Sequence, residues 1–119
     1  MKDGSVFIAA ALESIELIQS YTEGYSLDDF LADRKTQDAV IRNLEVIGQA
    51  LKDFGIEHLN EIMPEMPWRQ ISGMRNILAH EYLGVDMVMI WDTLKSHLCS
   101  LHTALQFIRE SGCLPGSER

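Results

Sequence analysis

The sequence predicts an all-α fold, an antiparallel bundle of four main helices plus one short extra helix, in a single domain over residues 1–119. Apolar residues recur every three or four positions, which is the helical period. No segment keeps the period-two alternation of a half-buried strand. The three prolines lie outside the expected helix interiors, and 46% apolar residues are enough for the core of one ordinary domain.

The first two helices are predicted from an apolar stripe and from a cap. Residues 5–22 should form the first helix, which ends at Gly24. Ser26 is the expected N-cap of the short helix, residues 27–33, because its hydroxyl can accept a free backbone N–H of the first turn. The core-facing stripe of the first helix comprises Ile8, Ala11, Ile15 and Ile18.

The third helix should start at a Thr36 cap and run to Phe54, where Gly55 stops it. Apolar side chains spaced by three and four form its core-facing seam. Gly48 interrupts the good helix formers, and a glycine inside a helix costs about 1 kcal/mol relative to alanine. We therefore expect a neighbouring helix to pack closely at Gly48.

Residues 56–65 are interpreted as a connection with at most one helical turn. Pro67 suits the first position of a helix over residues 67–83. A last, long helix should follow its N-cap Asp86 and end at Gly112. Its apolar stripe comprises Met87, Trp91, Leu94, Leu98, Leu101, Leu105 and Ile108.

Charge and apolar runs restrict the function classes. The formal net charge of −8 argues against sequence-independent binding of nucleic acid, which usually needs a basic face. The apolar run of residues 6–12 is too short to cross a bilayer and lacks the basic flank of a signal peptide. We therefore expect a soluble cytoplasmic protein without membrane contact. Cys99 and Cys113 lack the spacing of metal ligands, and Cys99 is interpreted as a core thiol.

The helix predicted over residues 67–83 carries unusual polar groups for a surface helix. Its expected apolar face comprises Ile71, Met74, Ile77 and Leu78. The opposite face of the helical wheel comprises Arg69, Gly73, Asn76 and His80, while Arg75 and Tyr82 share a third edge. Histidine can move a proton near neutral pH, and arginine presents a planar fork that fits a phosphate. RNA carries its own nucleophile, the 2′-hydroxyl, so such groups could cleave it without a metal.

Geometry leaves the arrangement of these groups open. Arg75 and His80 are five residues apart, so their directions differ by about 140° on a straight helix. The long arginine side chain could bend round, the helix could distort near its end, or a second subunit could complete the site.

Three other residues have more than one interpretation. Trp68 could stack on a base, although burial against the last helix is the favoured reading. Arg42 and Glu45, three apart, could form a helix-surface ion pair, support the site or contact a second subunit.

The segment Arg-Asn-Ile-Leu-Ala-His-Glu-Tyr, residues 75–82, resembles the HEPN signature of an arginine, four residues and a histidine. The tyrosine two residues after the histidine makes it similar to the HepT-like toxins in particular. The resemblance covers most of the chain, since residues 42–50, 64–73 and 83–91 also look like the family's flanking segments.

This resemblance implies an all-helical homodimer that is a metal-independent ribonuclease and needs no cofactor. It implies that Arg75 and His80 are the catalytic pair and that Asn76 assists them. It further implies a partner, a nucleotidyltransferase antitoxin, that adds AMP to Tyr82 and thereby blocks RNA.

The resulting hypothesis is an endoribonuclease toxin of a toxin–antitoxin pair, with His80 as general base and Arg75 stabilising the pentacovalent phosphate. Arg42, Glu45 and Arg69 are expected to support this site, and the arginines could form a local positive patch in an acidic molecule. The alternative is a non-catalytic HEPN subunit that binds a nucleotide or docks to a nucleotidyltransferase.

Overall fold

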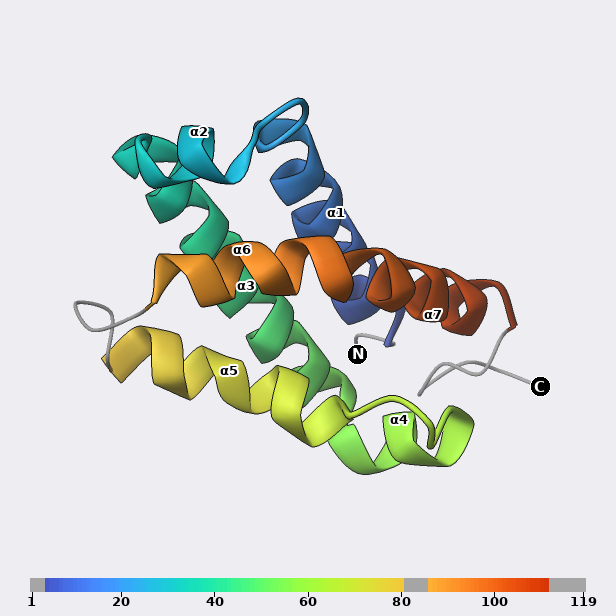
Figure 1. Ribbon diagram of the computed structural model, residues 1–119. Coiled ribbons are helices and arrows are strands. Elements are labelled where there is room, and N and C mark those ends of the chain that lie inside the picture. The colour runs from blue at the N-terminus through green and yellow to red at the C-terminus, as the bar shows by residue number, and fades with distance from the viewer. Residues whose placement is uncertain (1–3, 81–85, 112–119) are drawn as a thin grey trace.

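The fold consists of helices joined by short connections (Figure 1). The computed structural model describes residues 4–80 and 86–111, except for the side chains of Ile77, Ala79 and His80. Its helices are α1 (Ser5–Tyr21), α2 (Leu27–Leu31), α3 (Arg34–Phe54), α4 (Ile56–Ile62), α5 (Trp68–His80), α6 (Met87–Ser96) and α7 (Leu98–Ser111). The predicted all-α class is confirmed, and this part of the chain contains no strand.

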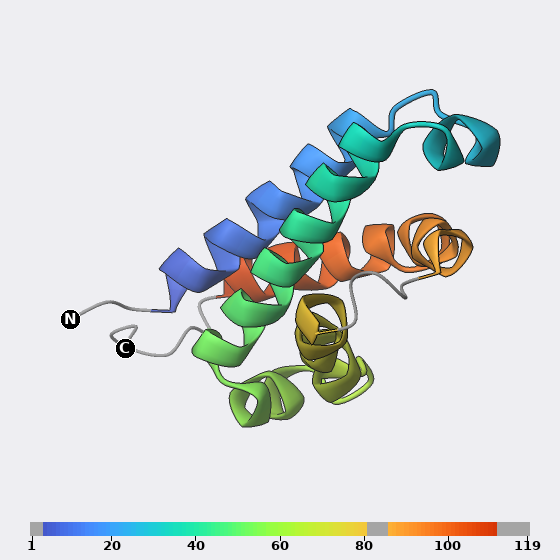
Figure 2. The same ribbon diagram turned by 90° about the vertical axis from the view of Figure 1, so that its left-hand side faces the viewer.

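The two long helices α1 and α3 lie side by side as an antiparallel pair (Figure 2). The predicted stripe of α1 is confirmed, because all four of its side chains have no exposed surface. The seam of α3 lies in the same core cluster. Burial of these apolar faces is the main source of helix stability here, because in folded proteins most helix stability comes from packing of the apolar face.

Two polar caps fix how the chain turns from α1 into α3. Ser26 caps α2 as predicted, since its hydroxyl accepts the backbone N–H of Asp29 at 3.1 Å. The predicted Thr36 cap of α3 is wrong, because Asp33 takes this position and accepts the backbone N–H of Thr36 at 3.1 Å. Consequently α3 begins at Arg34, and α2 ends at Leu31, short of residue 33.

The Asp33 carboxylate has more donors than a single cap requires. The hydroxyl of Thr36 donates to it at 2.7 Å, and the hydroxyl of Tyr25 donates at 2.6 Å. These bonds to the charged form, that of the Thr36 hydroxyl first, lower the pKa of Asp33 from 3.8 to about 2. An aspartate with three nearby donors therefore replaces the threonine as cap.

The connection after α3 holds more helix than predicted. Gly55 adopts a φ of +117°, a conformation that favours glycine, and turns the chain out of α3. The following α4 spans Ile56–Ile62, about two turns instead of at most one. Leu59 has no exposed surface, so burial of this side chain explains why the segment is helical.

The predicted long last helix is interrupted at His97, where φ is −125° and the chain divides into α6 and α7. Its N-cap is confirmed, since Asp86 Oδ1 accepts the backbone N–H of Val88 at 2.9 Å. Figure 2 shows α6 nearly end-on and α7 running across the view. The bend lets α6 pack on α2, where Trp91 and Phe30 rings lie 5.2 Å apart, while α7 packs on α1.

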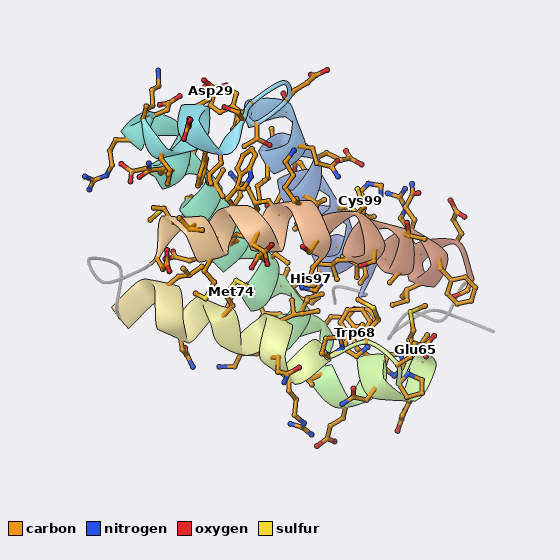
Figure 3. All side chains as sticks on the ribbon, in the orientation of Figure 1. Asp29, Glu65, Trp68, Met74, His97 and Cys99 are labelled. Atoms are coloured by element: carbon orange, nitrogen blue, oxygen red, sulfur yellow. The ribbon has the colours of Figure 1, made fainter. Side chains whose placement is uncertain are left out.

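Cys99 is exposed on α7, so its interpretation as a core thiol is wrong (Figure 3). It lies one residue after Leu98 of the buried stripe, and one helical step turns a side chain by about 100°. The other cysteine, Cys113, is outside the described residues. None of the helices described above is long and apolar enough to span a membrane.

Candidate functional site

The contact between α3 and α5 fixes the position of the backbone and Cβ atom of Arg75. A Cβ added to Gly48 would lie 2.9 Å from the Cβ of Arg75 and 3.1 Å from the carbonyl oxygen of Ser72. The Ser72 hydroxyl in turn donates to the carbonyl oxygen of Gly48 at 3.4 Å. The predicted close approach at Gly48 is confirmed, and the neighbour is α5 at Arg75. The glycine therefore lets the two helix backbones meet beneath a predicted catalytic residue.

Trp68 anchors the start of α5 in the core. Its side chain has no exposed surface, and its Nε1–H donates to the carbonyl oxygen of Met63 at 2.8 Å (Figure 3). The favoured reading, burial, is confirmed. Base stacking by Trp68 is wrong for this structure, because both faces of the indole are covered.

The guanidinium group of Arg75 bends toward Asn76. Arg75 Nη1 donates to Asn76 Oδ1 at 2.8 Å. On the helical wheel these two neighbouring residues point in directions about 100° apart, and the arginine side chain is long enough to span that separation. The sequence leaves three arrangements open for Arg75 and His80, and these stay predictions because the His80 side chain lies outside the described residues. The amide oxygen of Asn76 therefore lies next to the guanidinium group that this residue was predicted to assist.

His80 and Tyr82 cannot be placed in the same way. His80 is the last residue of α5, and its side chain lies outside the described part of the structure. Tyr82 falls between the described ranges altogether.

Arg75 lines two cavities on the surface of the α3–α5 pair. The first, here called the Arg42 cavity, has a volume of about 450 Å³. Its lining comprises Phe7, Ala10, Arg42, Glu45, Val46, Gln49, Ala50, Asp53 and Arg75. Arg42 and Glu45 form no ion pair with any residue described in the structure. They share a cavity with Arg75, and their expected roles, support of the site or contact with a second subunit, stay predictions.

The second cavity, here called the Arg69 cavity, has a volume of about 280 Å³. Its lining comprises Lys52, Ile56, Arg69, Ser72, Gly73, Arg75 and Asn76. The predicted polar face of the helical wheel is therefore confirmed for Arg69, Gly73 and Asn76. The sequence analysis missed Lys52, although a signal was present: Lys52 follows Gly48 by four residues and so shares its face of α3.

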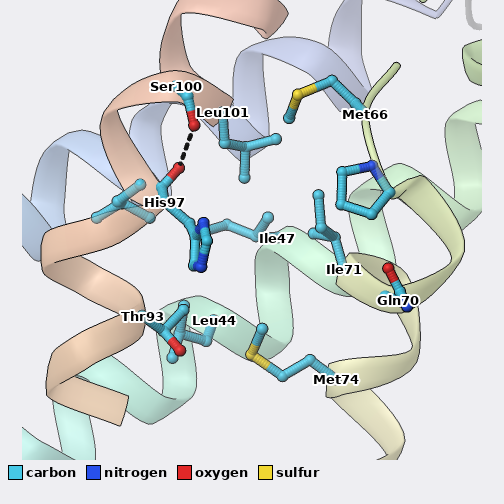
Figure 4. A pocket seen from close by; sticks show the side chains of 12 residues that line it. Leu44, Ile47, Met66, Gln70, Ile71, Met74, Thr93, His97, Ser100 and Leu101 are labelled. Atoms are coloured by element: carbon cyan, nitrogen blue, oxygen red, sulfur yellow. Dashed lines mark hydrogen bonds between the residues drawn. The ribbon is translucent and has the colours of Figure 1, made fainter. Parts of the chain in front are cut away.

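A third pocket, mostly apolar, lies between α5 and the helices α3, α6 and α7 (Figure 4). It has a volume of about 370 Å³ and is lined by residues of α3, α5, α6 and α7, including Ile71, Met74 and His97. The predicted apolar face of the helix is thereby confirmed for Ile71 and Met74. Neither Arg75 nor Asn76 lines this pocket, and both line the Arg69 cavity instead.

The remaining histidines outside α5 have local roles. His102 Nε2 lies 2.9 Å from a carboxylate oxygen of Glu16, which links α7 to α1. His58 lies beside Phe54, with ring centroids 5.5 Å apart. In the described ranges no three histidine, cysteine or acidic side chains gather as metal ligands.

Comparison with known proteins shows the family to which the chain is related. A family model described as "Ribonuclease HepT-like" matches residues 11–108. A protein of Thermococcus cleftensis named "Probable ribonuclease HepT" is 43% identical over 98 residues, which cover 82% of this chain and 88% of the relative. A "Putative RNase" of Caldanaerobacter subterraneus is 33% identical over 108 residues, covering 91% of this chain and 96% of the relative.

A third relative, from Methanocaldococcus jannaschii, is named "Gamma-glutamylcyclotransferase and putative RNase" and is 38% identical over 109 residues. These residues are 92% of this chain, which spans only about half of that relative's length, 49%. No solved structure matches the chain.

The helical bundle and its Arg-x4-His helix define a HEPN-type domain. Within this class, the chain belongs to the HepT-like ribonuclease family.

Proposed function

We propose that this protein is a metal-independent endoribonuclease. The observation that carries the proposal is the position of Arg75: its backbone is set by the Gly48 contact, its guanidinium donates a hydrogen bond to Asn76, and it lines an open basic cavity. A fixed guanidinium can stabilise negative charge that develops on a phosphate. Membership of a ribonuclease family supports RNA as the source of that phosphate.

In this mechanism, His80 accepts the proton of a ribose 2′-hydroxyl, and the 2′-oxygen attacks the adjacent phosphorus. Arg75 stabilises the pentacovalent phosphate while the bond to the 5′-oxygen breaks. The imidazolium returns a proton to the leaving 5′-oxygen. The products are a 2′,3′-cyclic phosphate and a 5′-hydroxyl, so the step requires neither a cofactor nor a metal.

The test of this chemistry is cleavage of purified RNA by the full chain. His80→Ala should lower the rate by at least about 10²-fold, the usual contribution of a general base. EDTA should leave the rate unchanged. Full activity of His80→Ala would contradict the mechanism, and loss of cleavage on chelation would contradict its independence of metal.

We also propose that the protein is the toxin of a toxin–antitoxin pair and that it acts as a homodimer. Its antitoxin would be a nucleotidyltransferase that adds AMP to Tyr82. Such a group brings bulk and negative charge close to the phosphate-binding helix, which would repel RNA. The support for this proposal is the tyrosine two residues after His80 in a HepT-like chain.

Expression in cells separates the toxin from the alternative, a non-catalytic subunit. Growth arrest without the partner, relieved by co-expression of the nucleotidyltransferase, would support the toxin. Unaffected growth together with stable partner binding would support the non-catalytic subunit. Intact mass of the co-expressed protein should show added AMP, and Tyr82→Phe should remove that addition.

A further inference from the structure

We propose that the Arg69 cavity is a second phosphate subsite, in which Lys52 and Arg69 bind the phosphodiester next to the one cleaved at Arg75. This inference rests on the proposed function for the identity of its ligand, a single strand of RNA. The chemistry recognised is a phosphate group held by cationic side chains.

The charge of the cavity is the first observation. Lys52 of α3 and Arg69 and Arg75 of α5 bring three cations to one cavity of about 280 Å³. The lining contains no carboxylate among the residues that the structure describes. The whole chain has 18 acidic and 10 basic residues. A cavity whose charged lining residues are all cations therefore differs strongly from the average charge of the chain. Like charges held together repel one another, and a bound anion would relieve this repulsion.

The absence of internal counter-ions is the second observation. None of Lys52, Arg69 and Arg75 forms an ion pair within the described ranges. By contrast, Arg34 lies 3.2 Å from Asp38, and the Lys95 ammonium lies 4.7 Å from the centre of the Trp91 ring. The cations of the Arg69 cavity are therefore available to an external anion. Among the described residues, the hydrogen-bond partner of the Arg75 guanidinium is the neutral amide of Asn76.

The shape of the cavity is the third observation. A Cβ added to Gly73 would meet no atom within 4 Å, so the space above this residue is open. A sugar–phosphate backbone could approach the main chain of α5 there without a side chain in its way. Asn76 adds an exposed amide at the same cavity. These features suit a strand that runs along α5.

The connection to the cleavage site is the fourth observation. Arg75 lines this cavity and is also the residue proposed to stabilise the scissile phosphate. A strand with one phosphate at Arg75 can place the neighbouring phosphate at Lys52 and Arg69. Lys52 and Arg69 therefore position the substrate and contribute affinity, without taking part in proton transfer. Contacts of this type carry no sequence information by themselves.

The experiment measures binding of a short fluorescein-labelled single-stranded RNA by anisotropy, over a series of salt concentrations. The full chain carries His80→Ala so that the RNA stays intact. Lys52→Ala and Arg69→Ala should each weaken binding about threefold to tenfold at low salt. Each should also reduce the slope of log K against log salt by about 0.7, the value for one phosphate contact on a single strand.

Three controls accompany the measurement. Lys35→Ala removes an exposed lysine of the same helix that lines neither cavity, and should leave affinity and salt slope unchanged. Lys52→Arg keeps the charge and should restore most of the affinity. Thermal denaturation followed by circular dichroism verifies that every variant is folded. A parallel titration with AMP separates a strand from a free nucleotide as the source of the phosphate.

The outcomes distinguish this proposal from the proposed function. If the wild-type chain cleaves RNA but Lys52→Ala and Arg69→Ala bind like the parent, the subsite is overturned and the nuclease stands. If no RNA is cleaved but binding depends on Lys52 and Arg69 as described, the nuclease fails and the subsite stands. Absence of RNA binding, or dependence of AMP binding alone on Lys52, would overturn the subsite.

Discussion

Arg75 shows which properties of single residues can be read from the sequence. Its residue type and its place five residues before His80 made it a predicted catalytic residue. A helical wheel, however, gives only the direction of each side chain and ignores its length. The structure shows the effect of that length, since the guanidinium of Arg75 donates a hydrogen bond to Asn76. Lys52 was missed for a related reason. The two arginines that line the cavity with it lie on α5, and the packing of α3 on α5 brings the three side chains together.

Asp33 offers a prediction at the same scale. Its pKa of about 2 in the folded chain lies below the ordinary value of 3.8, so its contribution to stability is fully present above about pH 4. This contribution should be lost as the pH falls toward 2. The difference in Tm between the wild type and Asp33→Asn should therefore be largest above pH 4 and shrink in acid.

Tyr25→Phe provides the matched variant, because it removes one of the donors to Asp33 and keeps the ring. It should reduce the same pH-dependent difference in part. A Tm difference between wild type and Asp33→Asn that is constant from neutral pH to pH 2 would contradict the proposed role of this carboxylate.

At the scale of the elements, the sequence predicted best where one local rule decides the structure. The stripe of α1, the Ser26 and Asp86 caps and the close approach at Gly48 are all confirmed. The predictions failed where elements compete for partners. The long last helix bends at His97 because α6 packs on α2 and α7 packs on α1, two surfaces that a sequence pattern does not place.

Two glycines of the α3–α5 pair give opposite predictions for the same substitution. Gly48→Ala would place its Cβ 2.9 Å from that of Arg75, so the helices must separate. Overpacking costs about 1–3 kcal/mol, which should outweigh the roughly 1 kcal/mol gained in helix propensity. We expect a lower free energy of unfolding and slower RNA cleavage.

Gly73→Ala is the matched control, because its Cβ would enter open space. It should raise the free energy of unfolding by about 0.5–1 kcal/mol through helix propensity alone. Urea denaturation of both variants tests this contrast. Equal effects of the two substitutions on stability would show that the contact at Gly48 is not close enough to matter.

At the scale of the whole molecule, an acidic chain places Lys52 and Arg69 in one cavity with Arg75, and none of the three forms an ion pair with a described residue. A net charge of −8 should suppress unspecific contact with nucleic acid, while the local cations retain a strand at the site. The proposed homodimer bears on the geometry of the site. The side chains of Arg75 and His80 point in directions about 140° apart on a straight helix, so a second subunit could complete the site. A two-fold axis near α5 could bring Arg75 of one subunit to His80 of the other.

Mixed dimers test this sharing of the site. Arg75→Ala and His80→Ala homodimers should both be inactive. If the site is shared, co-refolded mixtures should recover about a quarter of the wild-type activity, since half of the dimers have one complete site. No recovery in mixtures that light scattering shows to be dimeric would mean that each site uses one chain only.

The most direct test of the central claim is the single-turnover rate of RNA cleavage by Arg75→Ala, compared with the wild type and with Arg75→Lys. Removing the guanidinium should lower the rate by about 10²-fold or more, with little recovery by lysine, because a lysine lacks the planar fork. Unchanged Tm would show that the loss is chemical. Cleavage by folded Arg75→Ala at the wild-type rate would contradict the account.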